Sequence, residues 1–360
     1  MKKFLVLFSI LVFLSISCSK ETKKIVHLRY NSLDRIKIIP IIVNERGGTD
    51  QVTTFLSQLT ENNLKLSKRF EIMDLNNWAL MRDNPNTIVK INKIHSQIKR
   101  VITFFQNNKM EKAFDLSERL LIHLAKNFQY FEDIDEVYKL KAYQAASAVL
   151  GDVIDSERFF KQLAVLDPHY DFDSNKFGPG ILKQFKDAVR EIRREKKGVI
   201  TVNSSPVTAK VFINGKYVGV TPFQSEKIRV GQHYVKVEAD GYLPYGEVVS
   251  VQPQENPVEA TFRSFTINRE LNILRTSLTK STDKKEVKFP KTVLKFLRVI
   301  PFDQLIFIKT QTVNSEIYVK IYVYDVPTTS LYKTGDFKLN LDSDNLEDSY
   351  HNNLDRILNY

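Results

Sequence analysis

A short apolar leader that ends at the only cysteine of the chain sets the first limit on where this protein folds. Residues 4–16 are largely apolar, two lysines precede them, and Ser17 and Cys18 follow. A helix that spans a bilayer needs about 20 apolar residues, so this shorter stretch has the length of a secretory signal instead. Because no other cysteine follows, we expect an exported body that folds by packing alone, without disulfide bonds or cysteine-bound metal.

The residues around this cysteine resemble a bacterial lipobox. Ser17 directly precedes Cys18 and Leu14 lies four positions before it, while Ser15 stands where the enterobacterial pattern prefers Leu. The looser, spirochaete-like form of the motif accommodates that difference. The resemblance implies that the signal peptide, residues 1–17, is removed and that the Cys18 sulfur is acylated. An ordinary signal peptide followed by an incidental cysteine is the alternative.

A lipidated Cys18 would hold the folded body close to its membrane. Residues 18–24 form the tether in this interpretation, and six residues separate the cysteine from the first patterned segment at Ile25. Fully extended, that segment spans roughly 20 Å. We therefore expect a membrane-anchored lipoprotein of the cell envelope whose body faces the periplasm.

The chain is strongly basic, with a formal net charge of +11 that includes two lysines of the leader. A cytosolic chain with such a charge would be a candidate for nucleic-acid binding. An exported lipoprotein instead meets anionic lipid head groups and cell-wall polymers. We therefore expect no nucleic-acid partner. The positive charge either serves a specific anionic partner or, as the alternative, only keeps the surface soluble.

Residues 25–87 have the pattern of an α/β segment. A β-branched run at 36–43, interrupted by Pro40, predicts a buried strand, and Asp50 predicts the start of a helix with one apolar face. A second short strand is expected at 69–73, followed by another helix. This order resembles the opening of the TolB-amino-terminal and CsgG-like domains of envelope lipoproteins, and it implies the first half of such a fold.

Residues 88–197 have helical periodicity. Apolar residues recur at spacings of three and four, and Asp167-Pro168 ends one of the helices. Four small residues that permit a close helix contact lie in the preceding helix: Ala142, Ala145, Ala146 and Ala148. The pair resembles a tetratricopeptide (TPR) unit and implies a small TPR-like bundle, since one unit is too few for a solenoid. A further helix is expected from Pro179 or Ile181 to Lys197.

From residue 198 to 262 the period changes from helical to alternating. Asn214-Gly215 between short strands predicts a type I′ hairpin, because both central positions of that turn need positive φ. Four motifs follow one another: AKVFING at 209–215, GVTP at 219–222, GQHYV at 231–235 and GY at 241–242. They resemble the PEGA domain, a small β-sandwich of bacterial envelope proteins, although Pro206-Val207-Thr208-Ala209 replaces the tetrapeptide that names it. The resemblance implies binding or spacing and no catalytic residues.

Four aromatic residues of this segment are the candidate binding residues: Tyr217, Phe223, Tyr242 and Tyr245. One interpretation is an aromatic patch that binds a glycan or a protein. The other is that the rings fill the core of a small sandwich, where aromatic side chains are ordinarily found. The second interpretation is favoured.

Residues 263–360 return to an α/β pattern. After a helix, strands are expected at 305–308 and 316–325, and 331–337 could pair with the second strand. The segment resembles the closing half of the CsgG/TolB-like fold, which implies one α/β domain divided between the two termini. The expected fold class is multidomain α+β, with this divided domain, a central TPR-like helical bundle and a small all-β PEGA sandwich.

No sequence pattern for catalysis or for a cofactor accompanies these segments. The six histidines are scattered, and P-loop, dinucleotide-binding and nucleophile-elbow motifs are missing. We therefore expect no enzyme activity, no cofactor and no metal, but a binding or scaffold module for a protein or cell-wall partner. The alternatives are a CsgG-like oligomeric secretion component, with 316–325 in its membrane hairpin, and a cell-wall hydrolase.

Overall fold

The computed structural model describes residues 35–131, 134–281, 291–300, 302–328 and 330–358. The expected signal peptide, Cys18 and the tether lie outside these residues. Within them the chain is a mixed α+β protein that contains a five-stranded sheet, a β-sandwich and a set of helices. In this part of the chain no helix has both the length and the apolar composition needed to span a membrane.

Strands from both ends of the chain form one sheet in the order β13-β12-β11-β1-β2. Its strands are β1 (Ile36–Asn44), β2 (Phe70–Ile72), β11 (Gln304–Val313), β12 (Glu316–Asp325) and β13 (Ser330–Asn340). β1 runs parallel to β2 and β11, whereas β11, β12 and β13 are antiparallel. Ile38 pairs with Gln304, and Ile306 pairs with Val323. β11 therefore lies between the strands that contain Ile38 and Val323.

Pro40 occupies the middle of β1 without breaking the sheet. Proline cannot donate a backbone hydrogen bond, and it is normally confined to the edges of sheets. β2 pairs with residues 36–38 of β1, and on the opposite side Pro40 pairs with Ile306 of β11. Pro40 therefore lies past the end of β2, where the described sheet has no further strand that would receive its hydrogen bond.

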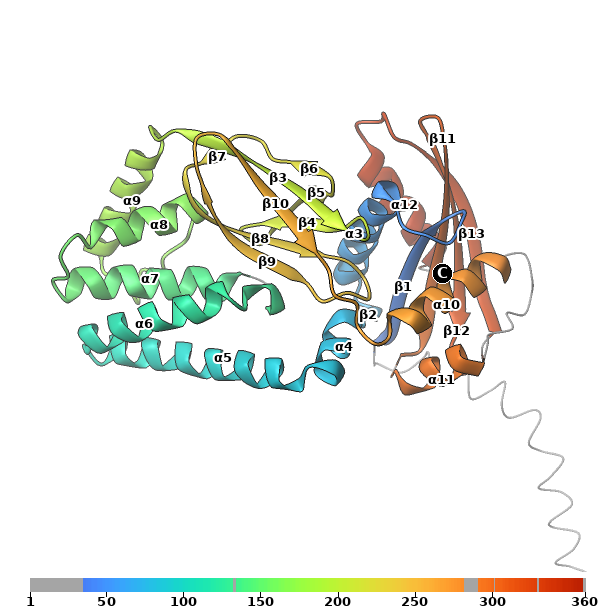
Figure 1. The fold of residues 1–360 in the computed structure, drawn as a ribbon, viewed down its shortest axis with the longest axis horizontal. Helices are drawn as coiled ribbons and strands as arrows, with labels where there is room; N and C mark the ends of the chain where they lie inside the picture. The colour runs from blue at the N-terminus through green and yellow to red at the C-terminus, as the bar shows by residue number, and fades with distance from the viewer. Residues whose placement is uncertain (1–34, 132–133, 282–290, 301, 329, 359–360) are drawn as a thin grey trace, which may run out of the picture.

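Helices cover both faces of this sheet (Figure 1). α3 (Gln51–Leu66) and α12 (Leu346–Leu358) pack on one face, and α4 (Leu75–Asp83), α10 (Asn268–Ser281) and α11 (Lys291–Val299) pack on the other. Alternate residues of β12 enter the two cores, with Val319 and Ile321 on the α3 side and Tyr322 and Tyr324 on the α10 side. One face of β12 is thus buried along the strand, and the other face is buried from Tyr322 onward, while Glu316 and Lys320 on it are exposed.

Asp50 caps α3, as the sequence predicts. Its side chain accepts a hydrogen bond from the Thr53 backbone N–H at 2.9 Å, and the Thr53 hydroxyl accepts from the Asp50 N–H at 2.7 Å. This reciprocal capping box satisfies two backbone donors at the start of the helix.

Residues 263–360 contain two helices, α10 and α12, that the sequence analysis does not predict. Each buries an apolar face at helical spacing. The buried leucines of α10 are Leu271, Leu274 and Leu278, and the buried residues of α12 are Tyr350, Leu354, Ile357 and Leu358. The spacing of these residues is the signal that identifies both helices in the sequence.

Five helices form a separate region with its own apolar core. They are α5 (Pro85–Gln106), α6 (Met110–Ala125), α7 (Asp135–Leu150), α8 (Glu157–Leu166) and α9 (Pro179–Ile192). α7 packs against α5, α6 and α8. Its alanines are completely buried: Ala142, Ala145, Ala146 and Ala148. Small side chains at these positions let the neighbouring helices approach α7 closely.

α9 ends earlier than the sequence pattern predicts. The expected helix continues to Lys197, but α9 ends at Ile192 and Lys197 opens the first strand of the sandwich. The next positions at helical spacing after Ile192 are Glu195 and Lys196, and both are exposed. No apolar side chain is available there to extend the buried face of the helix.

The β-sandwich consists of two sheets that enclose a core of small and β-branched residues. Its strands are β3 (Lys197–Ser205), β4 (Lys210–Ile213), β5 (Lys216–Val220), β6 (Phe223–Gln224), β7 (Ile228–Arg229), β8 (Gly231–Glu238), β9 (Tyr245–Val251) and β10 (Glu255–Thr261). One sheet contains β10, β3, β6 and β7, and the other has the order β5-β4-β8-β9. Asn214 and Gly215 have φ values of 50° and 74°, as the predicted hairpin turn requires.

The sandwich lies between the helical region and the five-stranded sheet (Figure 1). α8 contacts β8 on one side of the sandwich, and α3 contacts β4 and β5 on the other. The three units therefore meet around the β5-β4-β8-β9 sheet.

A contact between two buried hydroxyl groups, one on α3 and one on α12, allows a test of whether these helices share one core. The Tyr350 hydroxyl lies 2.6 Å from Thr60 Oγ1, which donates to the Leu56 carbonyl at 2.7 Å. Thr60→Val should lower the free energy of unfolding by about 1–3 kcal/mol, because it leaves the Tyr350 hydroxyl buried without a partner. Tyr350→Phe should cost only about 1 kcal/mol, because Thr60 keeps its bond to Leu56. Urea unfolding measures both changes.

The double variant provides the control. Removing both hydroxyl groups should cost less than the sum of the two single changes, because neither partner is left unsatisfied. Strict additivity would contradict the contact between the two helices.

Candidate functional site

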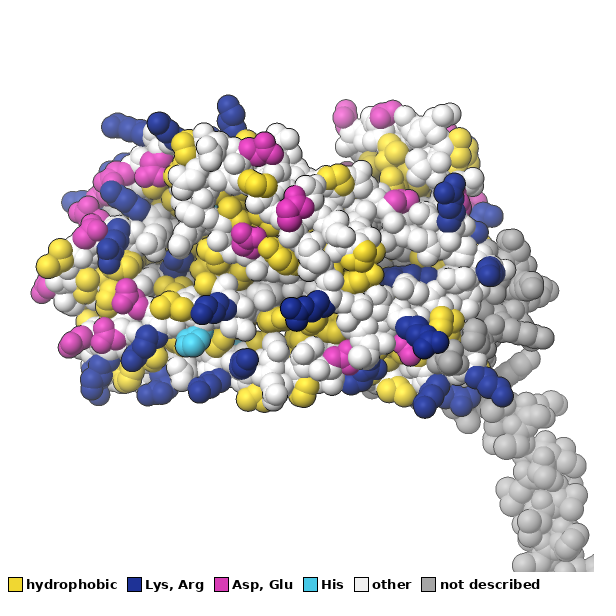
Figure 2. Space-filling model, viewed as in Figure 1, with side chains coloured by type: hydrophobic (Ala, Val, Ile, Leu, Met, Phe, Trp, Pro, Cys, Tyr) yellow, Lys and Arg dark blue, Asp and Glu magenta, His cyan; other side chains and the backbone are white. Residues whose placement is uncertain are grey.

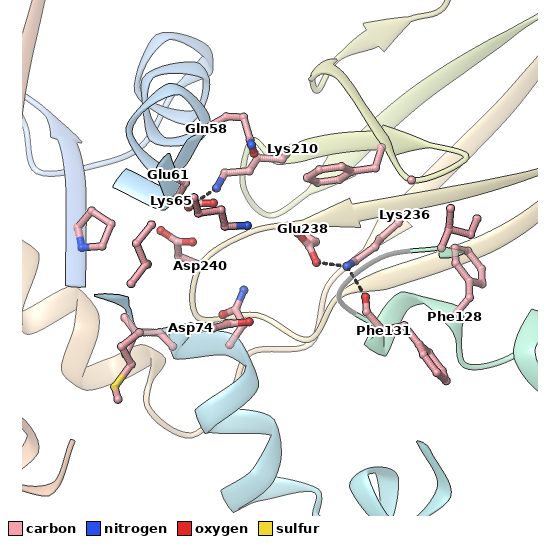
Figure 3. Close-up of a pocket in the computed structure, with 18 of the residues that line it drawn as sticks. Gln58, Glu61, Lys65, Asp74, Phe128, Phe131, Lys210, Lys236, Glu238 and Asp240 are labelled. Carbon is pink, nitrogen blue, oxygen red and sulfur yellow. Dashed lines mark hydrogen bonds and ion pairs between the residues drawn. The ribbon is translucent and has the colours of Figure 1, made fainter. Parts of the chain in front are cut away.

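A cavity of about 280 Å³ lies where the sheet domain, the helical region and the sandwich meet (Figure 3). Its polar lining consists of Gln58, Glu61, Lys65, Asp74, Asn76, Lys210, Lys236, Glu238 and Asp240. Its apolar lining includes Phe128, Phe131, Ile134, Phe212 and Tyr234. We call this space the junction cavity.

Alternation along β8 supplies a row of charges to this cavity. Val235 and Val237 are completely buried in the sandwich core, so Lys236 and Glu238 lie on the opposite face of the strand. Asp240 follows two residues later and also lines the cavity. The outer face of the sandwich is therefore charged where it meets the other two units.

The ion pair between Lys210 of β4 and Glu61 of α3 joins the sandwich to the sheet domain. Lys210 Nζ lies 2.5 Å from Glu61 Oε1, and their side chains are 8% and 26% exposed. Burial, together with the carboxylates of Asp240 and Glu238, raises the pKa of Glu61 against the effect of Lys210. Burial disfavours the charge on Lys210, but the same three carboxylates outweigh it and raise the pKa of Lys210.

Lys236 joins the sandwich to the helical region. Its Nζ donates to the Phe131 carbonyl at 3.0 Å and lies 2.6 Å from Glu238 Oε1 (Figure 3). Near this contact the rings of Phe128 and Tyr234 pack edge to face, with centroids 4.9 Å apart. The apolar side of the cavity is therefore built from helical-region and sandwich residues together.

Hydrogen-bond acceptors remain in the cavity beyond these pairs. Asp74 is the N-cap of α4 and accepts the Asn77 N–H at 2.9 Å, and burial raises the pKa of Asp74. Asp240 lies 3.7 Å from Arg275. Gln58 Oε1 is buried and has no hydrogen-bond partner among the described residues. Four carboxylates thus face three lysines in this cavity, within a chain whose net charge is +11.

The arrangement favours a cationic group. Carboxylate and amide oxygens accept hydrogen bonds, and an ammonium group offers three donors and no acceptor. The faces of the aromatic rings on the apolar side also attract cations. Among the described residues, no group of three His, Cys, Asp or Glu side chains is arranged to hold a metal ion.

A buried network at the Asn214 hairpin fixes the sandwich against the helices. The Tyr138 hydroxyl donates to the Asn214 carbonyl at 2.6 Å, and Asn214 Nδ2 donates to the Leu166 carbonyl at 3.3 Å. His233 Nε2 lies 2.8 Å from the Arg229 carbonyl, to which it must donate. His233 Nδ1 is then the acceptor for Asn214 Nδ2 at 2.9 Å. Burial lowers the pKa of His233 and so favours this neutral ring.

Asn76 of α4 makes a two-point contact with the sandwich. Its Nδ2 donates to the Ala239 carbonyl at 3.2 Å, and its Oδ1 accepts the Gly241 N–H at 3.0 Å. Gly241 has a φ of 86°, a conformation that glycine adopts without strain. This contact holds the turn after β8 against the sheet domain.

A second cavity of about 320 Å³ shares Lys210, Glu238 and Asp240 with the first. Residues 206–208 form part of its wall. The segment that departs from the PEGA tetrapeptide therefore faces the sheet domain, at a position where the sandwich contacts another unit.

The four aromatic candidates are divided between the core and the outer face of the sandwich. Phe223, Tyr242 and Tyr245 pack against its core. Tyr217 packs edge to face on Phe212, with ring centroids 5.8 Å apart, on the face that borders the junction cavity. All four are half-buried. This packing accounts for their burial without a ligand.

None of the charged cavity residues stood out in the sequence. The available signal is the alternation of Lys236, Glu238 and Asp240 along a strand whose other face is valine. In an isolated sandwich such a row would be exposed to water. Only the packing of the other two units shows that these charges line a cavity. Asp74 and Gln58 lie on helices that are distant in sequence, and no local pattern connects them to β8.

The family model of the PEGA domain matches residues 197–263. This match confirms the PEGA resemblance and coincides with the β-sandwich. A solved structure of a protein of unknown function from Bacteroides fragilis NCTC 9343, described as a candidate membrane-associated protein, is also similar. The identity is 15%, the alignment covers 37% of this chain and 60% of that chain, and the TM-score is 0.18. No curated protein matches the chain.

Removal of one member of the Glu61–Lys210 pair should destabilise the fold. Glu61→Gln leaves Lys210 buried without its carboxylate, and we expect the free energy of unfolding to fall by roughly 3 kcal/mol. Adding Lys210→Met to Glu61→Gln should recover most of this loss, because no buried charge then remains unpaired. Urea unfolding near pH 7 measures both.

The exposed Glu316–Lys338 pair, 3.2 Å apart, provides the matched control. Glu316→Gln should leave the stability nearly unchanged, because exposed ion pairs are well solvated. Equal effects of Glu61→Gln and Glu316→Gln would show that the junction pair is not buried in solution.

Proposed function

We propose that this chain is a non-catalytic binding and scaffold protein of the cell envelope. In this proposal the acylated Cys18 anchors the folded body to a membrane, on the periplasmic side. The junction cavity engages an ammonium group of a protein or cell-wall partner. Nucleic acid and cofactors have no part in the proposal.

The acceptors of the junction cavity that have spare hydrogen-bonding capacity support this function most directly. Asp74 forms no ion pair among the described residues, Asp240 has only the 3.7 Å contact with Arg275, and the buried Gln58 Oε1 has no donor. A lysine side chain of a protein and a free amine of a cell-wall peptide both present the donors that would satisfy them. The cavity is also small enough to select one such group rather than a large substrate.

The position of the sandwich supports the scaffold part of the proposal. Buried contacts join it to the helices through Tyr138 and Lys236, and to the sheet domain through Glu61 and Asn76. A domain fixed on two sides sets the distance and orientation between its neighbours. The PEGA domain is therefore proposed to act as a spacer that also forms one wall of a binding site.

The finer fold assignments belong to the same proposal. α7 and α8 are proposed to be a TPR-like pair, and the five-stranded sheet with its covering helices is proposed to be CsgG/TolB-N-like. The secretion alternative would place β12 in a membrane hairpin. One face of β12 and the second half of its other face pack within the domain, which favours the scaffold interpretation.

Chemical crosslinking followed by pull-down from envelope fractions tests the proposal. The cavity variant Asp74→Asn/Asp240→Asn should recover the partner at least about tenfold less well than the unmodified chain, because each charged hydrogen bond contributes roughly 1.5–3 kcal/mol. The control variant Asp115→Asn/Glu118→Gln removes two exposed carboxylates from α6 and should recover it normally. Equal recovery by both variants would contradict the cavity as the binding site.

The same preparations test the anchor. Metabolic labelling with a radioactive fatty acid should mark the unmodified chain and the cavity variant but not Cys18→Ser. A labelled Cys18→Ser variant would contradict acylation at this residue, whatever the pull-down shows.

A further inference from the structure

The outer face of α5 is basic and contains no acid. Lys90, Lys93, Lys99 and Arg100 are exposed, and the 22 residues of this helix include no Asp or Glu. Its opposite face is buried in the core of the helical region. The basic side chains are therefore concentrated on one solvent-facing surface.

α4 and α11 extend this surface along one edge of the molecule. Lys291, Lys295 and Arg298 of α11 are exposed, and its nine residues also include no Asp or Glu. α4 contacts α5, and Ala79 and Leu80 of α4 pack in the same core as α11. Figure 2 shows Lys and Arg side chains along the lower edge of the molecule, where Figure 1 places α5, α4 and α11. We call this surface the basic edge.

The protein does not neutralise the basic side chains that α5 and α11 contribute to the basic edge. Among the described residues, none of its seven lysines and arginines on α5 and α11 forms a salt bridge. On α9, by contrast, Arg190 pairs with Asp187 at 2.7 Å, and Glu191 pairs with Lys161 at 2.5 Å. The seven basic side chains of α5 and α11 are thus available to an anionic partner, whereas Arg82 of α4 pairs with Asp83 at 3.0 Å.

Large apolar side chains are exposed along the same edge. Met81, Val89 and Val299 are 52%, 65% and 59% exposed, and they belong to α4, α5 and α11 respectively. Exposed apolar residues among lysines are typical of surfaces that rest on a lipid bilayer, where the apolar groups enter the boundary between head groups and acyl chains. A soluble polyanion would need only the charges.

We propose that the basic edge docks on an anionic lipid surface. The lysines and arginines contact anionic head groups, and Met81, Val89 and Val299 enter the interface between them. Each basic residue near such a surface strengthens binding by about fivefold. The α5 and α11 helices then lie along the membrane, with α9 and the sandwich facing away from it.

The start of the described chain lies at this edge. Lys37 at the beginning of β1 donates its N–H to the Asp303 carboxylate at 3.0 Å, and Asp303 directly follows the loop after α11. From residue 18 to residue 35 an extended chain reaches at most about 60 Å. If Cys18 is acylated, as proposed above, the anchor and the basic edge can meet one membrane. Docking of the basic edge does not itself require acylation.

Fluorescence quenching by lipids that carry a nitroxide measures this orientation in the full chain. With Cys18→Ser in the background, a fluorophore is attached at Ser96→Cys on the exposed face of α5, or at Glu226→Cys between β6 and β7, which lie at the opposite edge of the molecule (Figure 1). The Ser96 label should be quenched at least about threefold more in vesicles of phosphatidylcholine and phosphatidylglycerol than in phosphatidylcholine alone, and less at high salt. The Glu226 label should show no such difference.

Charge-reversal variants distinguish binding through the basic edge from binding through the overall positive charge of the chain. Lys90→Glu/Lys93→Glu/Lys295→Glu should abolish the quenching of the Ser96 label. Lys183→Glu/Lys186→Glu/Lys196→Glu changes the net charge equally on the α9 side and should preserve it. All variants share the same N-terminal segment, so the two labels report the orientation of the folded body. Equal loss in both triple variants, or equal quenching at the two labels, would overturn the proposal.

The apolar residues distinguish a lipid surface from a soluble polyanion. Met81→Ser/Val89→Ser/Val299→Ser should reduce the quenching of the Ser96 label while leaving the binding of polyphosphate unchanged. Unaltered quenching in this variant, or binding of polyphosphate without quenching of the Ser96 label by anionic vesicles, would contradict docking on lipid. Circular dichroism confirms that each variant is folded.

Discussion

The parallel pairing of β1 with β11 determines the arrangement of the whole molecule. It joins segments such as Lys37 and Asp303, which lie 266 residues apart in the chain. The chain must leave the sheet after β2, build the helical region and the sandwich, and return to the same sheet. Closing so long a loop costs conformational entropy, which the buried cores on both faces of the sheet offset. The helices and the sandwich are therefore held at both ends by one sheet.

Where these units meet, buried charged groups lie beside an apolar contact such as that of Phe128 with Tyr234. The outer face of the sandwich presents Lys210, Lys236 and Glu238, and each finds a partner on another unit or on its own strand. Buried ion pairs add little net stability, but they penalise any arrangement in which one partner is missing. The junction thus specifies the relative positions of the units. It also leaves acceptors such as Asp74 unsatisfied by cations, which is why the same place is proposed as a binding site.

Local sequence patterns predicted most of the elements but missed α10 and α12, and the PEGA motifs predicted the sandwich. The capping box at Asp50, the hairpin at Asn214 and the alternation of the PEGA motifs each depend on residues close in sequence. The sequence placed the end of α9 several residues beyond its true end at Ile192. The charged residues that follow are compatible with a helix, but they have no apolar side chains to bury. The junction cavity depends on Gln58, Asp74 and β8, and only tertiary packing brings such distant residues together. The periodicity of apolar residues therefore predicts helices and strands but not the interfaces between them.

The proposed binding site exists only if the sandwich is held in one position between the helices and the sheet. A pulsed electron paramagnetic resonance measurement between spin labels at Ser174→Cys in the helical region and Asp336→Cys on β13, in a Cys18→Ser background, tests this directly. One narrow distribution of distances is the result that the junction contacts require. A broad distribution, or several separate distances, would mean that the units move independently and that the cavity between them is not a fixed site.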